Sequence, residues 1–308
     1  PKNPVHVDVF TLRFAGMCSM NKPTTRPGRV EEITSTANPR IKSIKGLALK
    51  KNRDREGLFV AEGQKLVTDA LERDWDVHTL LYSHQALQDT QRQSRIEALA
   101  AQARSRGGDV LITNNKLLTS ITRKDNPQAV IAVMRQRQTP LKDIKGLGNQ
   151  CWVALDRVRD PGNLGTIIRT ADALGAQGVI LVGESTDPFA LEAVRATMGS
   201  LFHIDVIRTT ETQFIEFCHD WKTQGGQVTG THLNGAVDHR KIDYSKGPQI
   251  LLMGNEQSGL TDELADSCSS LALIAMDGAA DSLNLAVATG IMLFEARRHQ
   301  LTLKGQGD

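Results

Sequence analysis

The chain has 308 residues, 40% of them hydrophobic and 23% charged, which is typical of a globular protein with room for two domains. It has no stretch of about 18 apolar residues, so we expect no membrane-spanning helix. The formal net charge of +2 does not by itself indicate a nucleic-acid partner. The four cysteines, Cys18, Cys151, Cys218 and Cys268, lack zinc-site and C-x-x-C spacing, so we expect reduced thiols, no metal and a cytoplasmic protein.

Residues 1–30 contain scattered Pro, Asn and Thr and show no hydrophobic period. They also lack the apolar segment and small-residue cleavage site of a secretory signal. We therefore predict that this segment is a disordered extension.

A first α/β domain is predicted over 31–138, because strand and helix patterns alternate there. Seven Lys and Arg residues lie in the span from Arg40 to Arg55, which includes most of its first helix, against one acidic residue, Asp54. That cluster is either a solvated helix face or a contact for phosphates. In chain order the patterns predict a helix at 38–52, a strand at 58–61, a helix at 62–75, a strand at 77–82, a helix at 85–106, a strand at 110–113, a helix at 116–121 and a strand at 129–134.

A linker at 139–150, with Pro140 and two glycines, separates this domain from a second one at 151–302, and 303–308 is a tail. Strands such as 179–182 and 250–253 are apolar throughout, which predicts a parallel sheet covered by helices on both faces. The patterns predict strands at 152–155, 178–182, 202–207, 227–231, 249–253 and 271–274, and helices at 164–174, 190–198, 212–224, 261–265 and 282–300.

Three polar segments follow apolar strands of the second domain: 163–169, 254–259 and 274–284. Loops at the carboxyl ends of strands are where ligands bind in open α/β sheets, so the three segments predict one shared site. Each has an ordinary alternative. Asn163 could simply cap a helix, Glu256 could be a turn residue in water, and Ser282 could be the N-cap of the last helix, with Asn284 at its second position. A dinucleotide turn is disfavoured, because G-x-G-x-x-G is absent here.

Taken together, these segments resemble the SpoU (TrmH-like) class of the SPOUT RNA methyltransferases. The three motifs of that family are approximately N-x-G-x-x-x-R-T-A, G-x-E-x-x-G and I-P-M-x-G-x-x-x-S-L-N-x-S-V-A, and they occur here in order from Asn163, Gly254 and Ile274. Ala275 replaces the usual Pro and Ala286 the usual Ser. The segments 33–40 and 57–63 also resemble the L30e-like substrate-binding domain that often precedes this catalytic domain.

The resemblance implies 2′-O-ribose methylation of RNA with S-adenosylmethionine as cofactor, a trefoil knot in the catalytic domain and a homodimer formed by its first and last helices. It implies that ribosomal RNA is the substrate, because the L30e-like domain is typical of members that modify it. By the same resemblance, we expect the catalytic residues to be Asn163, Arg169, Glu256, Ser282 and Asn284, and the cofactor to contact Thr231, Gly254, Ile274 and Leu283. From their positive charge, we expect Arg40, Lys42, Lys45 and Arg195 to contact RNA phosphates.

The role of Arg169 is open, because an Arg side chain stays protonated and is a poor proton acceptor. It can instead grip a phosphate and orient the ribose. Three other functions stay open at this point: a tRNA methyltransferase of the same class, an RNA-binding protein without activity, and a nucleotide-dependent oxidoreductase.

Overall fold

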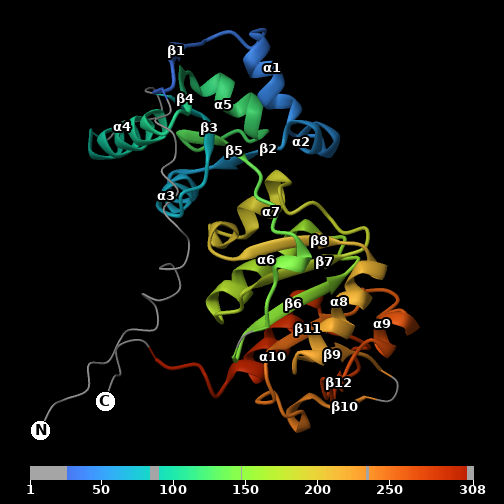
Figure 1. Cartoon of the computed structure of the whole chain (residues 1–308). Helices are drawn as coiled ribbons and strands as arrows, with labels where there is room; N and C mark the ends of the chain where they lie inside the picture. The colour runs from blue at the N-terminus through green and yellow to red at the C-terminus, as the bar shows by residue number, and fades with distance from the viewer. Residues whose placement is uncertain (1–25, 84–89, 147, 234–235, 304–308) are drawn as a thin grey trace, which may run out of the picture.

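The computed structural model describes residues 26–83, 90–146, 148–233 and 236–303. The described chain forms two α/β units joined by a single connection from β5 to β6 (Figure 1). The α/β fold class expected from the sequence is confirmed, with a mixed sheet in the N-terminal unit and a parallel sheet in the C-terminal unit. The expected knot and L30e-like fold stay predictions. The predicted extension at 1–30 lies mostly outside the described residues.

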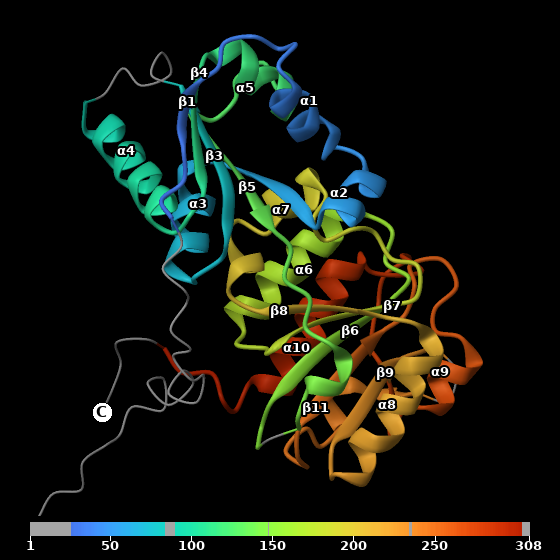
Figure 2. The same ribbon diagram turned by 45° about the horizontal axis from the view of Figure 1, so that its top comes forward.

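The N-terminal unit is built on a sheet with strand order β1-β4-β3-β5-β2 (Figure 2). Strand β5 runs antiparallel to β2 and β3, and the other pairs are parallel. Helices α1 and α5 pack on one face of this sheet, and α3 and α4 pack on the other. The bounds are β1 Val30–Glu32, α1 Pro39–Gly46, α2 Lys50–Glu56, β2 Leu58–Glu62, α3 Gln64–Glu72, β3 Val77–Ser83, α4 Thr90–Ser105, β4 Asp109–Thr113, α5 Asn115–Thr122 and β5 Val130–Arg135.

The single helix predicted at 38–52 is wrong, because the chain turns between α1 and α2. Leu47 is drawn into the core at this turn, where it is 3% exposed. Arg53 Nη1 donates to the carbonyl oxygens of Leu47 and Ala48, at 2.8 and 3.0 Å. These two bonds replace the helical hydrogen bonds that the turn removes.

Three strands differ from the sequence prediction, and one of these, the two-residue strand β10 (Val237–Asp238), was not predicted. Strand β1 was not predicted, yet it pairs with β4 at the edge of the sheet. The strand predicted at 202–207 is β8, Asp205–Thr209, whose register begins at the pair Gly178↔Asp205. The preceding turn, η3 Ser200–Phe202, follows Gly199, whose φ of 105° is in the region that favours glycine.

The C-terminal unit contains a sheet with strand order β10-β12-β9-β11-β6-β7-β8, and every described pair in it is parallel. Residues on successive positions of β6 enter two different cores: Val153 and Leu155 face α6, α7 and α10, whereas Trp152 and Ala154 face α8 and α9. Burial on both faces confirms the covered parallel sheet that was predicted. The bounds are β6 Cys151–Asp156, α6 Pro161–Ala173, β7 Gly178–Val182, α7 Leu191–Ala196, β8 Asp205–Thr209, α8 Glu211–Thr223, β9 Gln227–Thr231, β10 Val237–Asp238, β11 Gln249–Met253, α9 Asp262–Asp266, β12 Ser270–Leu273 and α10 Leu285–Arg297.

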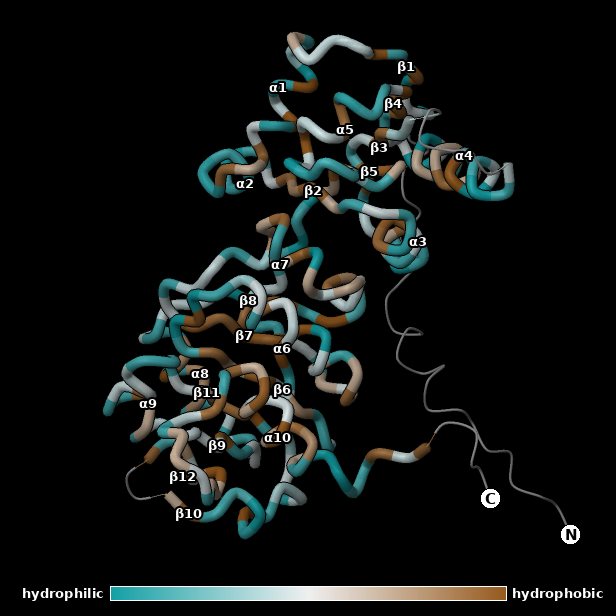
Figure 3. The backbone as a smooth tube through the Cα atoms, turned by 180° about the vertical axis from the view of Figure 1, so that it is seen from behind, coloured by the Kyte–Doolittle hydropathy of each residue, from teal (hydrophilic) through white to brown (hydrophobic). Residues whose placement is uncertain are grey.

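Hydrophobic residues concentrate on the inner strands of both units (Figure 3). None of the helices in the described part of the chain is long and apolar enough to cross a membrane. Three of the predicted thiols, Cys151, Cys218 and Cys268, are free and wholly or partly buried, as expected. Cys18 lies outside the described residues.

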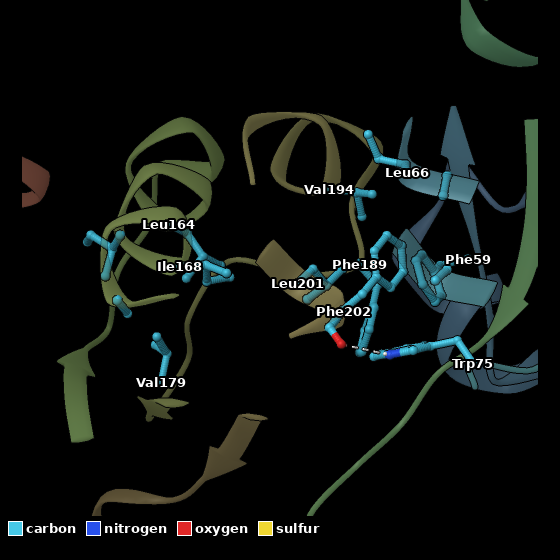
Figure 4. Close-up of a cluster of buried hydrophobic side chains, with 14 of the residues drawn as sticks. Phe59, Leu66, Trp75, Leu164, Ile168, Val179, Phe189, Val194, Leu201 and Phe202 are labelled. Carbon is cyan, nitrogen blue, oxygen red and sulfur yellow. Dashed lines mark hydrogen bonds between the residues drawn. The ribbon is translucent and has the colours of Figure 1, made fainter. Parts of the chain in front are cut away.

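An aromatic cluster joins the two units (Figure 4). Phe59 and Trp75 come from the N-terminal unit and Phe189 and Phe202 from the C-terminal unit, and the Phe59 and Phe189 rings are 4.8 Å apart. Trp75 Nε1 donates to the carbonyl of Phe202 at 3.3 Å. A shared hydrophobic core of this kind opposes the free relative motion that is the default for linked domains.

Candidate functional site

The three polar segments predicted from the sequence meet at the carboxyl ends of β6, β11 and β12. Asn163 connects them. Its Nδ2 donates to Glu256 Oε1 at 2.5 Å, and its Oδ1 accepts from Asn284 Nδ2 at 2.9 Å. One amide side chain therefore bonds to both of the other segments, which lie 93 and 121 residues away in the sequence.

Helix α6 begins in a way that fixes Asn163. The side chain of Asp160 caps the helix and accepts from the Asn163 backbone N–H at 2.6 Å, and Pro161 takes the first helical position. Thus Asp160 is the cap, and the side chain of Asn163 is free to bond to the other two loops. The alternative that Asn163 only caps a helix is wrong.

The last helix, α10, begins at Leu285, so the prediction that Ser282 opens it is wrong. Asn284 is the N-cap, and its Oδ1 accepts from the N–H groups of Ala286 and Val287 at 2.9 and 3.3 Å. Its Nδ2 is left to reach Asn163. An amide has both a donor and an acceptor end, and this position uses both.

The segment 254–259 is a tight loop closed by two hydrogen bonds, from Asn255 N to Gly259 O and from Gly259 N to Asn255 O, both of 3.0 Å. Asn255 holds it from inside, with Oδ1 accepting from Gln257 N at 2.9 Å and Nδ2 donating to Arg157 O at 3.0 Å. Glu256 projects from the loop and is exposed. The loop therefore presents a carboxylate toward α6 on a constrained backbone.

A pocket of about 560 Å³ opens beside this loop. All four residues predicted to contact the cofactor line it, and so do Glu256 and Ser282. The sequence reasoning missed several other lining residues, of which His232 and Leu233 directly follow Thr231 and could have been found by extending that strand end. The lining residues are Thr231, His232, Leu233, Met253, Gly254, Asn255, Glu256, Gln257, Ser258, Gly259, Ala272, Leu273, Ile274, Met276, Asp281, Ser282, Leu283, Leu285 and Ala288.

The pocket has apolar walls next to a glycine-containing loop. Its volume is in the usual range for small-molecule sites, and Ile274 and Leu283 give it apolar walls. Thr231 Oγ1 accepts from Gly254 N at 3.1 Å and so fixes the start of the loop. A Cβ at Gly254 would lie 2.9 Å from the backbone of Gly259 and Leu260, so the loop can fold back only over glycine.

Arg169 does not line this pocket. It lies six residues beyond Asn163 on α6, roughly 9 Å further along the helix axis at 1.5 Å per residue. Its side chain is exposed, and among the described residues it forms no ion pair. Its catalytic role stays a prediction, as do those of the other four predicted residues.

Arg157 was missed by the sequence reasoning. Its guanidinium makes two hydrogen bonds, of 2.9 and 2.8 Å, to the fully buried carboxylate of Asp156 at the end of β6. Hydrogen bonding to Asp156 raises the pKa of the Arg157 guanidinium. Its backbone has a φ of 46° and its carbonyl holds Asn255. The sequence signal that could have identified Arg157 is its position directly after Asp156, the charged residue that ends strand β6.

The four residues predicted to contact RNA divide into two pairs. Lys42 and Lys45 are exposed on α1. Arg40 is bound to Glu31 and Asp109, at 3.0 and 2.5 Å. Arg195 is bound to the buried carboxylate of Glu62 across the two units and also donates to Thr122 O at 3.1 Å. Contacts to RNA stay predictions for all four. To contact RNA, Arg40 and Arg195 would have to break their ion pairs or bind the phosphate and the carboxylate at the same time.

Comparison with known proteins gives a consistent result. Residues 150–294 match the SpoU rRNA Methylase family, and residues 38–132 match the MRM3-like substrate binding domain. The 23S rRNA (guanosine(2553)-2'-O)-methyltransferase RlmP of Bacillus subtilis is 30% identical over 268 residues, which are 87% of this chain and 100% of that protein. The 23S rRNA (uridine(2479)-2'-O)-methyltransferase of Streptomyces viridochromogenes is 31% identical over 281 residues, 90% of this chain and 95% of that one.

Solved structures agree. An AdoMet-bound rRNA methyltransferase from Sinorhizobium meliloti is 54% identical, with a TM-score of 0.83, over 89% of this chain and 100% of that chain. The AdoMet complex of the SpoU methyltransferase AviRb from Streptomyces viridochromogenes is 30% identical, with a TM-score of 0.76, over 85% and 98% of the two chains.

Proposed function

Because the chain belongs to the SpoU rRNA methylase family, we propose that it transfers a methyl group from S-adenosylmethionine to a ribose 2′-oxygen of large-subunit ribosomal RNA. The observation that carries the proposal is the pair of hydrogen bonds that the Asn163 side chain makes with Glu256 and Asn284. They join the three family motifs beside a pocket of suitable size. Relatives similar over nearly the whole chain are named as 23S rRNA 2′-O-methyltransferases, and this similarity supports the choice of substrate.

In this proposal the pocket beside Gly254 holds the cofactor. Bound S-adenosylmethionine supplies a methyl group on a sulfonium, an electrophile that needs no metal. The chain contributes a fixed loop, in which Thr231 anchors Gly254, and the apolar walls formed by Ile274 and Leu283. Such walls exclude water, and backbone groups can recognise a neutral adenine without charged side chains.

The acceptor ribose must be held in line with the methyl group and must lose the proton of its 2′-hydroxyl. Arg169 is suited to the first task, because an exposed guanidinium without an ion pair among the described residues can grip the adjacent RNA phosphate with its planar fork. Ser282 borders the pocket and faces the RNA in this scheme. The proton passes to the phosphate, to a water or to a transiently neutral guanidine.

The proposal assigns residues 31–138 to RNA binding and 151–302 to catalysis, in a cytoplasmic protein. It also includes a homodimer. Val287 and Phe294 on α10 are 52% and 56% exposed, and their spacing of seven residues places them on one face of the helix. Ile291 lies between them and is partly buried. An apolar stripe of this kind on a surface helix supports a second copy as its cover.

Methyl transfer tests the proposal directly. The purified protein is incubated with S-adenosylmethionine carrying a labelled methyl group and with either 23S rRNA or bulk tRNA, and the product is digested to nucleosides for mass spectrometry. We expect a labelled 2′-O-methylnucleoside from 23S rRNA. Label in tRNA alone would support the tRNA alternative, label on a base would overturn the ribose reaction, and no transfer to either RNA would favour a binding protein.

Arg169→Lys tests whether Arg169 must grip the RNA phosphate with a planar fork, because Lys keeps the positive charge and loses the fork. We expect this variant to lose most methyl transfer while its affinity for S-adenosylmethionine, measured by calorimetric titration, is unchanged. Near-native transfer across the pH profile would contradict the need for a fork.

A further inference from the structure

A second pocket, of about 460 Å³, lies where the two units meet. One wall is the first residue of α2, Lys50, from the N-terminal unit. The other walls are Arg159 after β6, the segment 183–186 after β7, and Arg208 on β8, all from the C-terminal unit. We call this the seam pocket. It shares no lining residue with the pocket beside Gly254.

The seam pocket carries free positive charge. Lys50 and Arg159 are exposed, and in the described ranges neither has an acidic partner within ion-pair distance. Arg208 is compensated, because Asp187 binds it and Asp54 lies 3.6 Å from its Nη1. Glu184 is the acidic residue among those that line the pocket. Two uncompensated cations thus face one carboxylate.

A buried ion pair holds the two walls of the seam pocket together. Arg53 lies three residues after Lys50 on α2, and its Nε donates to Asp187 Oδ2 at 2.7 Å. Both side chains are about 5% exposed. Asp187 directly follows Thr186, whose N–H donates to Val158 O at 2.7 Å. The backbone that carries Lys50 is therefore tied to the backbone of the opposite wall by the ion pair between Arg53 and Asp187.

The seam pocket is also connected to the three-loop site through the chain. Arg159 immediately precedes Asp160, whose side chain caps α6 and bonds the backbone of Asn163. On the other wall, Lys50 follows Lys42 and Lys45 of α1 in the sequence, and all three side chains are exposed.

We propose that the seam pocket binds a backbone phosphate of the RNA substrate, held jointly by Lys50 and Arg159 and separate from the nucleotide that is methylated. This inference rests on the proposed function, because it assumes RNA at the three-loop site. Lys and Arg supply the charge-assisted donors that phosphate oxygens accept, and the hydroxyl groups of Ser185 and Thr186 lie in the same lining. Because the contact is to the backbone, it positions the RNA without reading its sequence.

The test measures the binding of an in vitro 23S rRNA transcript by filter retention at salt concentrations from 50 to 200 mM. The variants are Lys50→Gln, Arg159→Gln and the double variant. The matched control is Lys241→Gln, an exposed Lys next to β10 at the opposite end of the sheet from β8. Calorimetric titration with S-adenosylmethionine checks that every variant is folded and binds cofactor as the wild type does.

We expect each single variant to weaken RNA binding and the double variant to reduce the slope of log Kd against log salt by about one, because one phosphate is lost. Between 50 and 200 mM salt, the Kd of the double variant should therefore rise by a factor that is roughly threefold to fourfold smaller than the factor for the wild type. The control and cofactor binding should be unchanged.

Three results would overturn the proposal that Lys50 and Arg159 jointly hold one phosphate. They are a double variant with the wild-type slope, a slope change near two, and an equal effect of Lys241→Gln. A slope change near two would mean that the two residues make independent contacts. The binding readout needs no turnover, so the two proposals fail differently. Wild-type binding without methyl transfer would contradict the proposed function, whereas normal transfer with an unaltered double variant would contradict the seam pocket alone.

Discussion

Replacing Arg53 with Met should lower the free energy of unfolding by about 3 to 5 kcal/mol, the range found when one partner of a buried ion pair is removed. Arg53 is 4% exposed and joins the two units through Asp187. Met has a similar length and fills the same space without charge, so the substitution removes the electrostatic contacts and leaves most of the packing.

The magnitude follows from the contacts of this side chain. Loss of the charge-assisted bond to Asp187 costs about 1.5 to 3 kcal/mol, and leaving the buried carbonyl of Leu47 without its donor costs about 1 to 3 kcal/mol. The total loss of unfolding free energy stays below the sum of the two upper values, because Arg208 remains bound to Asp187 and compensates the charge of its carboxylate.

Urea unfolding followed by Trp fluorescence measures this loss, since Trp75 lies in the aromatic cluster between the units. Asp54→Asn is the matched control. It removes a charge that is 45% exposed and 3.6 Å from Arg208, and such exposed pairs contribute about 1 kcal/mol or less. A loss for Arg53→Met no larger than that of the control would refute the reasoning that the buried pair holds the units together.

Three further predictions concern other parts of the fold. Gly165→Ala should cost about 1 to 3 kcal/mol, because the new Cβ would lie 2.4 Å from Ala196 Cβ and force α6 and α7 apart; an unchanged melting temperature would contradict this close approach. Burial raises the pKa of the Cys151 thiol to about 12 from an ordinary value of 9.0, so the stability that the thiol contributes is present below pH 9 and is lost as the pH rises toward 12. The difference in unfolding free energy between wild type and Cys151→Ala should therefore change by up to about 1.4 kcal/mol per pH unit in that window, and parallel pH curves would count against it. Phe294→Glu should convert a dimer to a monomer in sedimentation experiments, because it places a charge in the apolar stripe of α10; a variant that stays dimeric would locate the interface elsewhere.

The three-loop site could be predicted from the sequence because polar residues interrupt apolar strands at their carboxyl ends. The start of α10 could not. Asp281, Ser282 and Asn284 are all good capping residues, and local preference does not choose among them. Asn284 is the cap that also donates to Asn163, and a serine hydroxyl lacks the separate donor and acceptor atoms for both bonds.

The role of Arg195 shows a second limit of sequence reasoning. It was predicted to contact an RNA phosphate, but its guanidinium binds Glu62, which is 133 residues earlier in the chain. An Arg with a free charge and an Arg paired across a domain boundary look alike in sequence, because the pairing depends on the packing of α7 against β2. The same holds for Arg53 within the basic helix, whose burial no local pattern indicated.

The aromatic cluster between the units sets a practical condition for work with fragments. A catalytic fragment that begins at the linker would expose Phe189 and Phe202 to water and would leave Asp187 without Arg53. Newly exposed aromatic surface promotes self-association, so such a fragment should aggregate even if its own sheet folds. Fragments that remain monodisperse will need polar replacements at these two phenylalanines, and activity lost on truncation will report broken packing as well as missing RNA contacts.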